Sequence, residues 1–544
     1  MARGEAREVE AQAPVGPGIA GAATLIALGN VASRVLGLVR ETVIADLFGA
    51  TGLVSAFDVA SRVPRMLFDL LIDGLVSSAL VPVFSELAER DPDELWRVAS
   101  IMLSLAVLVM SAAALLLELF AHQVAWLMSG GFEPALLEDT ARLMRITTPA
   151  VLFLSLSGIT TGLLYALKRF ALPAFTAAVF NASIVVVALL LAGVLGWGVE
   201  SLALGLLVGS AMQVALQVPG LRGAHLRFNL NWHHPQLRRI VRLYTPVVLG
   251  LVVSQIGIVI DRNLASRTGE QSIAWMRYAT TLVQFPLGLV SVAVALAILP
   301  TLSRQASSPA DADLDEFMDT LAAGLKMVLA LILPAVAGLF VLAGPVVALV
   351  FEHGDFTPFD TAQTALALRI YLLGTTFAAI DLPLVYAFYA RKNTLTPALV
   401  GVLGVGFYLA AALAPALFRD LRMTDLVLAN SVQLTGHALV MLWLAHRLGS
   451  LRRRGLGQTA LKTLAASLVM GGLVFVSAQR LTMYLPGQGL LHKALVVGGA
   501  ALAGLVVYAT AVTWLGVEEV GMFVALVRRR LRARDLLPQN PSKQ

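Results

Sequence analysis

The chain has 544 residues, of which 58% are hydrophobic and only 14% are charged, with a formal net charge of +6. Soluble domains average about 25% charged residues. This composition, with a mean hydropathy of +0.80, therefore predicts an all-α polytopic membrane protein and excludes an ordinary soluble enzyme. Cysteine is absent, which excludes disulfides, thiolate metal sites and cysteine nucleophiles. The bias of basic residues toward cytoplasmic loops of membrane proteins explains the net positive charge better than nucleic-acid binding does, so we expect no nucleic-acid partner.

About fourteen apolar segments are each near or above the ~20 residues that a helix needs to cross a bilayer. They fall at roughly 18–48, 53–86, 95–119, 138–166, 172–196, 198–218, 240–266, 272–303, 316–351, 360–390, 395–417, 424–446, 457–479 and 490–514. The second, fourth and tenth are long enough to tilt or to kink at Pro64, Pro149 and Pro383. The polar start of the chain and the long segment after it are unlike a cleavable signal peptide.

Basic residues predict the orientation of these segments. With the N-terminus inside, about two dozen Lys and Arg lie in inside loops against roughly eight outside, as the positive-inside rule requires. The acidic loops at 86–94 and 311–319 are also inside, but Asp and Glu contribute little to orientation. We therefore expect both termini to be cytoplasmic.

The sequence also repeats itself. GGFEP at 130–134 matches GDFTP at 354–358, and Tyr165 and Lys168 match Tyr389 and Lys392 at the same offset (389 − 165 = 224). An offset of six helices preserves topology, so helices 1–6 and 7–12 are predicted to be two parallel-repeat lobes around a central cavity, an architecture typical of transporters. Two C-terminal helices stand outside the repeat.

The repeat sets the expected domain boundaries. They are a cytoplasmic N-terminal segment at 1–17, an N-lobe at 18–218, a basic cytoplasmic linker at 219–239, a C-lobe at 240–446, helices 13 and 14 at 447–515 and a basic cytoplasmic tail at 516–544.

The first helix carries Arg34, Arg40 and Glu41 at membrane depth. A charge at the bilayer centre costs at least about 2.5–3.5 kcal/mol, so such residues face a wet cavity rather than lipid. A largely cationic cavity predicts an anionic ligand. The alternative is that one arginine reaches to the membrane interface, as Arg near helix ends often does.

On the second helix, Arg62, Arg65, Asp69 and Asp73 follow a spacing that forms one stripe. One interpretation is that the two arginines bind a ligand, while the two acidic residues balance their charge or act in gating. The other is that the four residues neutralise one another in a ladder of ion pairs that only holds helices together.

In the second half, Asp261 and Arg262 lie near the outer end of helix 7 and Arg277 lies early in helix 8. Charges at helix ends are often interfacial anchors. The alternatives are charge balancing or gating for the helix 7 pair and ligand binding for Arg277, whose helix corresponds to helix 2.

Asp381 lies well inside helix 10, with no basic residue within a turn. It is either protonated and structural, or it carries a coupling proton. Asn430, Gln433 and His437 form a polar stripe on helix 12 that predicts interhelical hydrogen bonds more than an ion site. The histidines show no metal-ligand spacing, and neither HExxH nor a Walker phosphate-binding loop occurs. We therefore expect no metal, no catalytic residues and no enzyme.

Several motifs resemble the MurJ/MviN family of lipid II flippases, within the multidrug/oligosaccharidyl-lipid/polysaccharide exporter superfamily. They are SRVLG at 33–37 with Arg40, LFGA at 47–50, Pro64, Gly74, VPV at 81–83, Trp275, Tyr278 and Ala279, Phe285 and Pro286, and Phe388 to Ala390 with Thr396 and Pro397. The resemblance covers helices 1 to 12 in order.

The resemblance implies a fourteen-helix, two-lobe transporter that moves undecaprenyl-pyrophosphate-linked disaccharide-pentapeptide from the inner to the outer leaflet of the bacterial cytoplasmic membrane. It implies that arginines of a cationic cavity bind the pyrophosphate and that helices 13 and 14 form a groove for the lipid tail. Arg34 and Arg40 fall on the family's two helix 1 arginines, and Arg62 falls where the family has Lys or Arg.

The chain departs from the family pattern at three positions. Phe68 and Thr281 replace family arginines, and Ser55 replaces an acid. Arg65 lies three residues before Phe68 and Arg277 four before Thr281, so we expect each positive charge to be displaced by one turn. Helix 11 has no carboxylate or amide, so the sodium site of some relatives is not expected.

The sequence thus predicts alternating access with lipid II as substrate, membrane lipids and the cell-wall synthesis machinery as partners, no cofactor, and a membrane potential or ion gradient as the driving force. The alternatives are an exporter of another polyprenyl-linked oligosaccharide and a non-transporting paralogue that acts as an interaction protein in cell-wall assembly.

Overall fold

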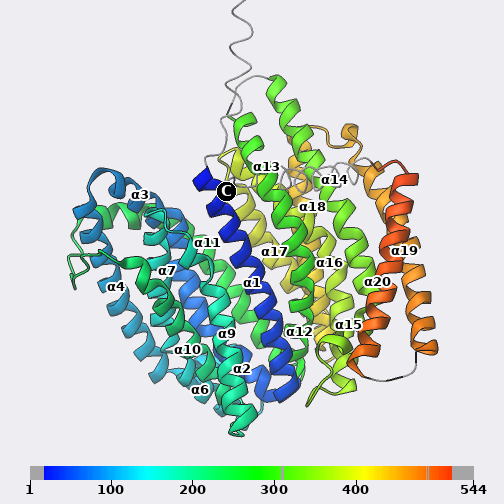
Figure 1. Ribbon diagram of the computed structural model, residues 1–544, viewed down its shortest axis with the longest axis horizontal. Helices are drawn as coiled ribbons and strands as arrows, with labels where there is room; N and C mark the ends of the chain where they lie inside the picture. The colour runs from blue at the N-terminus through cyan, green and yellow to red at the C-terminus, as the bar shows by residue number, and fades with distance from the viewer. Residues whose placement is uncertain (1–16, 308–310, 486, 488, 518–544) are drawn as a thin grey trace, which may run out of the picture. The chain divides into compact units, whose positions relative to one another are not determined.

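The computed structural model describes residues 17–307, 311–485, 487 and 489–517, and within these ranges every regular element is a helix. Figure 1 follows the chain from α1 in blue to α20 in red. Most of the two terminal segments expected at 1–17 and 516–544 lies outside the described residues.

The chain forms two compact units, Met1–Asn263 and Leu264–Gln544, which are described separately. The helices that begin in the first are α1 (Pro17–Phe48), α2 (Gly52–Phe68), η1 (Asp69–Asp73), η2 (Val76–Leu80), α3 (Val81–Arg90), α4 (Pro92–Leu119), α5 (Ala121–Ser129), α6 (Pro134–Thr147), α7 (Ala150–Ala166), α8 (Ala171–Ala174), α9 (Thr176–Ala188), η3 (Leu189–Val194), α10 (Glu200–Gln217), η4 (Val218–Leu221) and α11 (Pro235–Ser266). The second unit contains α12 (Ser272–Pro286), η5 (Leu287–Ser291), α13 (Val292–Gln305), α14 (Asp311–Val341), α15 (Ala343–Val350), α16 (Pro358–Ala390), α17 (Leu395–Leu413), η6 (Pro415–Leu417), α18 (Met423–Leu448), η7 (Arg452–Arg454), α19 (Leu456–Tyr484) and α20 (Leu490–Trp514). Since the units divide inside α11, most of this helix is counted with the first unit.

The expected count of fourteen spans is not confirmed. Within the described part of the chain, 11 helices are long and apolar enough to cross a membrane, or up to 13 if each of two bent helix pairs is one span. The expected segment at 316–351 is also two helices, α14 and α15. Length and apolarity alone do not reveal the break between them.

One of the three expected proline kinks is observed as a break. Pro149 lies between α6 and α7, whose axes differ by 42°. Pro64 and Pro383 instead lie inside α2 and α16. Proline removes one backbone hydrogen bond and crowds the preceding turn, but neighbouring helices can hold such a helix together.

Caps fix several helix starts. Thr51 accepts a hydrogen bond from the Val54 amide at the start of α2, and Asp91 accepts one from the Glu94 amide, 3.0 Å away, at the start of α4. At α16, Thr357 and Asp360 form a reciprocal capping box with Pro358 in the first turn. These caps satisfy amides that have no partner within the helix.

The internal repeat is visible in the order and length of the elements. The α6–α7 pair spans 134–166 and α16 spans 358–390, which is the predicted offset (358 − 134 = 224). The span of α2 to α3 contains the π-helical segment η1, and the span of α12 to α13 contains the π-helical segment η5, 218 residues later (287 − 69 = 218). The repeat therefore extends to local backbone geometry.

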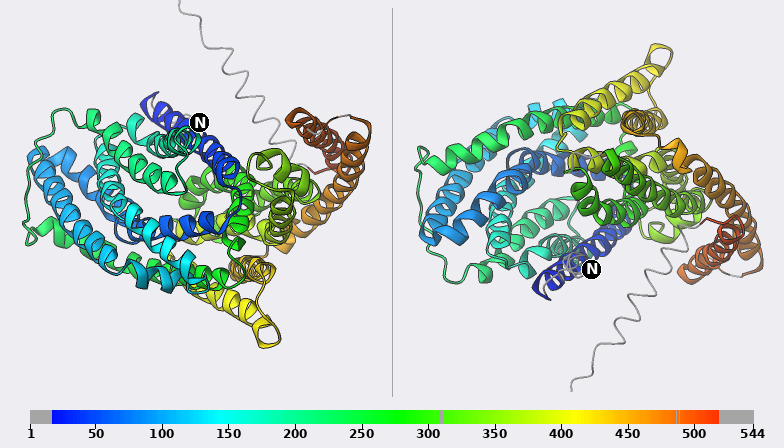
Figure 2. Two further views of the ribbon diagram at one scale, coloured as in Figure 1. Left: turned by 90° about the horizontal axis from the view of Figure 1, so that it is seen from below. Right: turned by 90° about the horizontal axis from the view of Figure 1, so that it is seen from above.

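Helices α19 and α20 pack on α14 within the second unit. Figure 2 shows the pair at one edge of that unit. Their shared core contains Ala330, Met470, Val474 and Tyr508, and the Tyr508 hydroxyl donates a 2.5 Å hydrogen bond to the Ala330 carbonyl. The pair is thus attached to α14 by both apolar packing and a buried hydrogen bond.

Candidate functional site

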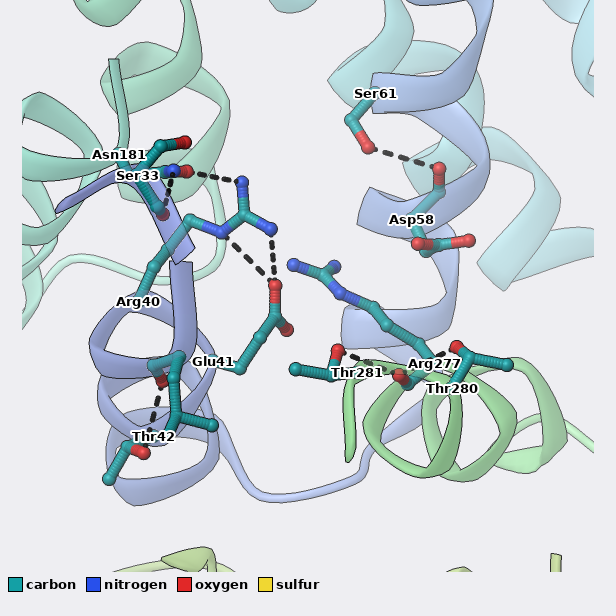
Figure 3. Close-up of polar contacts among 11 residues, drawn as sticks. Ser33, Arg40, Glu41, Thr42, Asp58, Ser61, Asn181, Arg277, Thr280 and Thr281 are labelled. Carbon is teal, nitrogen blue, oxygen red and sulfur yellow. Dashed lines mark hydrogen bonds and ion pairs between the residues drawn. The ribbon is translucent and has the colours of Figure 1, made fainter. Parts of the chain in front are cut away.

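Arg40 lies at the centre of a polar network between α1 and α9 (Figure 3). Its Nε and Nη2 donate to Glu41 Oε1 at 3.0 and 2.5 Å, and its Nη1 donates to Asn181 Oδ1 at 2.9 Å. The Asn181 amide nitrogen donates in turn to the Ser33 carbonyl at 3.1 Å. One guanidinium is therefore held by a carboxylate and an amide at the same time.

This network orients Arg40 without enclosing it. Glu41 is 1% exposed and Asn181 is 8% exposed, whereas the Arg40 side chain is 26% exposed. Arginine presents five N–H donors in a fixed fork, so the accessible edge is preset to bind a phosphate or carboxylate. Such an anion has to compete with Glu41. Sequence reasoning missed Asn181, although a lone amide in an apolar helix is a usable signal.

The arginines of α2 differ from Arg40 in their surroundings. Arg65 donates to Asp69 at 2.9 Å, its side chain is 54% exposed, and its guanidinium lies 5.3 Å from the Phe68 ring centre. Arg62 and Arg34 are partly buried. The ion pair matches the predicted ladder, but its exposure makes it a weak contact.

The predicted stripe on helix 2 passes through a change of helix type at Asp69. Residues Asp69–Asp73 are π-helical, and a π segment has a wider turn than an α-helix. Asp73 therefore does not continue the α-helical register of Arg62 and Arg65. It still lies close enough to Arg65 and Asp69 to feel both charges.

Asp58 and Arg262 form a buried ion pair between α2 and α11. Their charged atoms lie 3.5 Å apart, and the side chains are 8% and 13% exposed. Asp261 lies 4.0 Å from Arg262, and the Asn263 side chain donates to the Leu127 carbonyl at 2.9 Å. Sequence reasoning placed Asp261 and Arg262 together but missed Asp58. The sequence did offer a signal for Asp58, because it lies one turn after Ser55, the position at which the resemblance implies an acid.

The other end of α11 is also attached to the first unit. Arg239 donates to Glu86 at 2.8 Å, and the His234 ring lies 3.1 Å from Glu94. Further along the helix, the Tyr244 hydroxyl donates to the Leu70 carbonyl. Polar contacts therefore hold both ends of α11 to other helices of the first unit.

Arg277 belongs to the second unit, whereas Arg34, Arg40, Arg62 and Arg65 belong to the first. It is partly buried on α12, and its carbonyl accepts hydrogen bonds from the Thr280 and Thr281 hydroxyls at 2.9 and 3.0 Å (Figure 3). Thr281 therefore bonds to the helix backbone and presents no charge at the position where the resemblance implies an arginine.

Asp381 has a basic partner that its own helix does not supply. Its Oδ1 lies 2.9 Å from Nδ1 of His437 on α18, and the two side chains are 20% and 18% exposed. The predicted interhelical role of the helix 12 stripe is confirmed for His437. Among the residues that the structure describes, no cluster of three or more acidic or histidine side chains can hold a metal ion.

Comparison with known proteins identifies the family. Residues 44–495 match the family model described as "Lipid II flippase MurJ". A probable lipid II flippase MurJ from Vibrio cholerae is 33% identical over 395 residues, which cover 70% of this chain and 74% of that protein. The lipid II flippase MurJ of Burkholderia cenocepacia is 31% identical over 382 residues, covering 68% and 73%.

Solved structures agree on the fold. A lipid II flippase MurJ in an inward closed conformation superposes with a TM-score of 0.76 at 24% identity, covering 90% of this chain and 98% of that one. An inward-facing MATE family multidrug transporter gives a TM-score of 0.64 at 15% identity, covering 77% and 96%. From the extent of the family match and the identity to its members, we conclude that the chain belongs to the lipid II flippase MurJ family, whose members are membrane transporters and not enzymes.

Proposed function

We propose that the chain carries lipid II, with its undecaprenyl-pyrophosphate and disaccharide-pentapeptide, from the inner to the outer leaflet of the cytoplasmic membrane by alternating access. The observation that carries this proposal is the geometry of Arg40. Glu41 and Asn181 hold one guanidinium at 2.5–2.9 Å with part of its donor fork accessible. A preset fork binds phosphate oxygens bidentately and loses little side-chain entropy.

The other arginines share the charge of the head group in this proposal. Arg34, Arg62 and Arg65 act with Arg40 on the N-lobe at 18–218, and Arg277 contributes from the C-lobe at 240–446. Two phosphates and the peptide carboxylates need several positive groups, because desolvated anions are costly unless each is paired. Arg65 and Arg277 stand in for the arginines absent at Phe68 and Thr281.

The acidic residues keep these charges from repelling one another when the carrier is empty. Glu41 pairs with Arg40, and Asp69 with Arg65, at distances of 2.5 and 2.9 Å. Asp73 balances the same region, and Asp261 with Arg262 gates the outer end of α11. Binding of the pyrophosphate then exchanges a protein carboxylate for a substrate anion, so the net cost of desolvation stays small.

The remaining parts have supporting roles. Helices 13 and 14, within 447–515, line a groove for the lipid tail, and both termini are cytoplasmic, with the linker at 219–239 and the tail at 516–544 on the same side. The membrane potential or an ion gradient drives the return of the empty carrier, with Asp381 as the group that carries a coupling proton. Cell-wall synthesis enzymes receive the product on the outer side.

A second function, export of another polyprenyl-linked oligosaccharide, is favoured by one observation. Thr281 uses its hydroxyl on the Arg277 carbonyl, so the charge pattern of the second lobe differs from that of the family. A head group with a different arrangement of anionic groups fits a displaced arginine equally well.

Rescue of bacteria depleted of their own lipid II flippase tests the proposal. The parent chain is expected to restore growth, and Arg34→Ala, Arg40→Ala and Arg277→Ala are expected to fail at equal membrane levels. Arg90→Ala is the matched control, because Arg90 is 76% exposed and its ion pair is with Glu86, one turn away on the same helix. Failure of a well-inserted parent, or full rescue by the three variants, would contradict the proposal.

A further inference from the structure

The contact between Asp381 and His437 joins two helices inside the apolar part of the second unit. Asp381 lies nine residues before the end of α16 (390 − 381 = 9) and His437 eleven before the end of α18 (448 − 437 = 11). At ~1.5 Å per residue these depths are about 14 and 17 Å. Both helices are long and apolar enough to cross a membrane. The pair is therefore placed well below the helix ends.

The 2.9 Å contact is satisfied when His437 Nδ1–H donates to the Asp381 carboxylate, which leaves Nε2 as the nitrogen that binds or releases a proton. With a proton on Nε2, the imidazolium and the carboxylate form a charge-assisted hydrogen bond and the pair has no net charge. Loss of the proton leaves a net charge of −1. The pair therefore has two well-defined forms that differ by one proton.

The pair is partly exposed and has small or polar neighbours. The two side chains are 20% and 18% exposed, so neither is sealed inside the protein. On α17, a Cβ added to Gly404 would lie 3.6 Å from the His437 ring and 3.7 Å from Gln433, so the helix backbone packs directly against the imidazole. Gln433 lies one turn before His437 and supplies a neutral polar neighbour.

Two tyrosines extend the polar path toward the end of α16. Tyr386 and Tyr389 lie five and eight residues after Asp381, and their ring centres are 6.1 Å apart. Tyr389 is 45% exposed. Along α16 these two hydroxyl-bearing residues lie between Asp381 and the end of the helix, where they are suitable steps for a proton.

Few other ionisable groups lie on the elements packed against α16 and α18. Those elements are α12, α13, α14, α15 and α17 with the segment η5. Apart from the acidic start of α14, their described ionisable residues are Arg277, Tyr278, Arg304, Lys326 and Tyr408. The contacts that the structure gives Asp381 and His437 are with each other, so each is the nearest titratable partner of the other.

We propose that Asp381 and His437 form a proton-binding site that loads and releases one proton in each transport cycle. The inference rests on the proposed transport function and assigns its coupling ion. A proton from water on the outer side forms the N–H bond at His437 Nε2, and the same bond breaks when the proton passes to water on the cytoplasmic side, while Nδ1–H keeps its bond to Asp381. The cation moved is a proton, and the Asp381 carboxylate balances its charge.

The binding step is tested on the purified full chain without transport. The chain has 8 histidines, so an NMR titration of protein labelled at histidine Cε1 identifies His437 by the signal missing from His437→Gln. The titration curve of that signal is expected to move in Asp381→Asn and to stay unchanged in Ser431→Ala. Ser431 joins the same two helices by donating to the Ile370 carbonyl at 2.7 Å, but it does not titrate.

The transport step is tested in proteoliposomes with fluorescent lipid II and the membrane potential clamped. A pH difference of one unit is expected to raise the rate of the parent by up to about tenfold, the ratio of proton activities. Asp381→Asn and His437→Gln lose this response, whereas Asp381→Glu and Ser431→Ala keep it.

The outcomes separate this inference from the proposed function. The proton site is overturned if Asp381→Asn and His437→Gln still respond to the pH difference, or if the parent flips lipid II without responding to it. Either result leaves the proposed flippase function intact. A titration that moves in Asp381→Asn in a chain that flips no lipid II supports the site and overturns the proposed function. If the titration curve of the His437 signal does not change in Asp381→Asn, the proton site is overturned, whatever the transport experiment shows.

Discussion

Lys168 and Lys392 lie 224 residues apart and adopt the same left-handed backbone conformation, with φ of 60° and 59°. In the described part of the chain they are the non-glycine residues with positive φ. The amide of each donates to the carbonyl three residues before it, and the next amide donates to the carbonyl five residues before it, the pattern of a Schellman cap. Both caps end the fourth long helix of their repeat, so the duplication includes a strained turn.

Glycine at these caps is expected to stabilise the protein. A left-handed conformation costs an L-residue about 1 kcal/mol and costs glycine nothing. Lys168→Gly and Lys392→Gly should therefore raise the midpoint of thermal unfolding in detergent relative to alanine at the same sites. Alanine keeps the strain and removes the exposed Lys168–Glu89 contact of 3.4 Å, so it is the matched control. Glycine variants that melt below the alanine variants would refute the strain.

Asn181 is expected to be a positioning residue for Arg40. Asn181→Ala removes the 2.9 Å hydrogen bond to the guanidinium, and a hydrogen bond to a charged group contributes about 1.5–3 kcal/mol. Apparent affinity for lipid II should fall about tenfold or more. Ser183→Ala on the same helix breaks only a bond to the Val179 carbonyl and should bind like the parent. Equal affinities for the two variants would remove Asn181 from the site.

The Asp58–Arg262 pair should show strong coupling in a double-mutant cycle of unfolding free energies. Breaking a buried pair by removing one partner costs about 3–5 kcal/mol, because a buried charge is left behind. Asp58→Asn and Arg262→Gln should each destabilise strongly, and the double variant should cost less than the sum. Arg97→Ala provides the control, because Arg97 is 62% exposed in its pair with Glu94, and such a surface pair is worth about 0–1 kcal/mol. If the two single substitutions lower the unfolding free energy additively in the double variant, the ion pair contributes nothing to stability.

Gly374 is expected to be intolerant of any side chain. A Cβ at this position of α16 would lie 2.7 Å from the Cα of Ser431 on α18, and a backbone atom cannot move away cheaply. Gly374→Ala should destabilise by about 1–3 kcal/mol. Gly401→Ala on α17 meets nothing within 4 Å and should stabilise by up to about 1 kcal/mol, as alanine does in a helix. Calorimetry of both variants tests this, and a neutral Gly374→Ala would disprove the close helix contact.

The sequence predicts the helices well because a membrane span is a local property of composition. Apolar runs located nearly every long helix, and the offset of 224 residues paired the repeats correctly. Of the fourteen expected spans, the first, at 18–48, has no counterpart among the 11 described helices and two bent pairs that are long and apolar enough to cross a membrane. The segment expected at 316–351 is two helices, α14 and α15. No window of sequence distinguishes one long helix from two shorter ones.

Partners of the charged residues were harder to predict, because they come from other helices. Asp381 has no base within a turn, and its histidine is 56 residues away in the chain. Arg40 was recognised from its motif, but Asn181 lies 141 residues away. The sequence shows which charged residues lie within apolar segments. The packing of α16 on α18 and of α1 on α9 decides which side chains bond to them.

The π-helical segments η1 and η5 interrupt two long spans. In each span, the side chains after the π segment are rotated about the helix axis relative to those before it. A π turn accommodates one more residue than an α turn, so every position beyond it is rotated relative to the face that the first half defines. No single helical wheel describes the span from Gly52 to Arg90 or from Ser272 to Gln305. A substitution scan should therefore show a change of phase at 287–291 in the second span, and changes of phase at 69–73 and at the further π-helical segment η2 (Val76–Leu80) in the first.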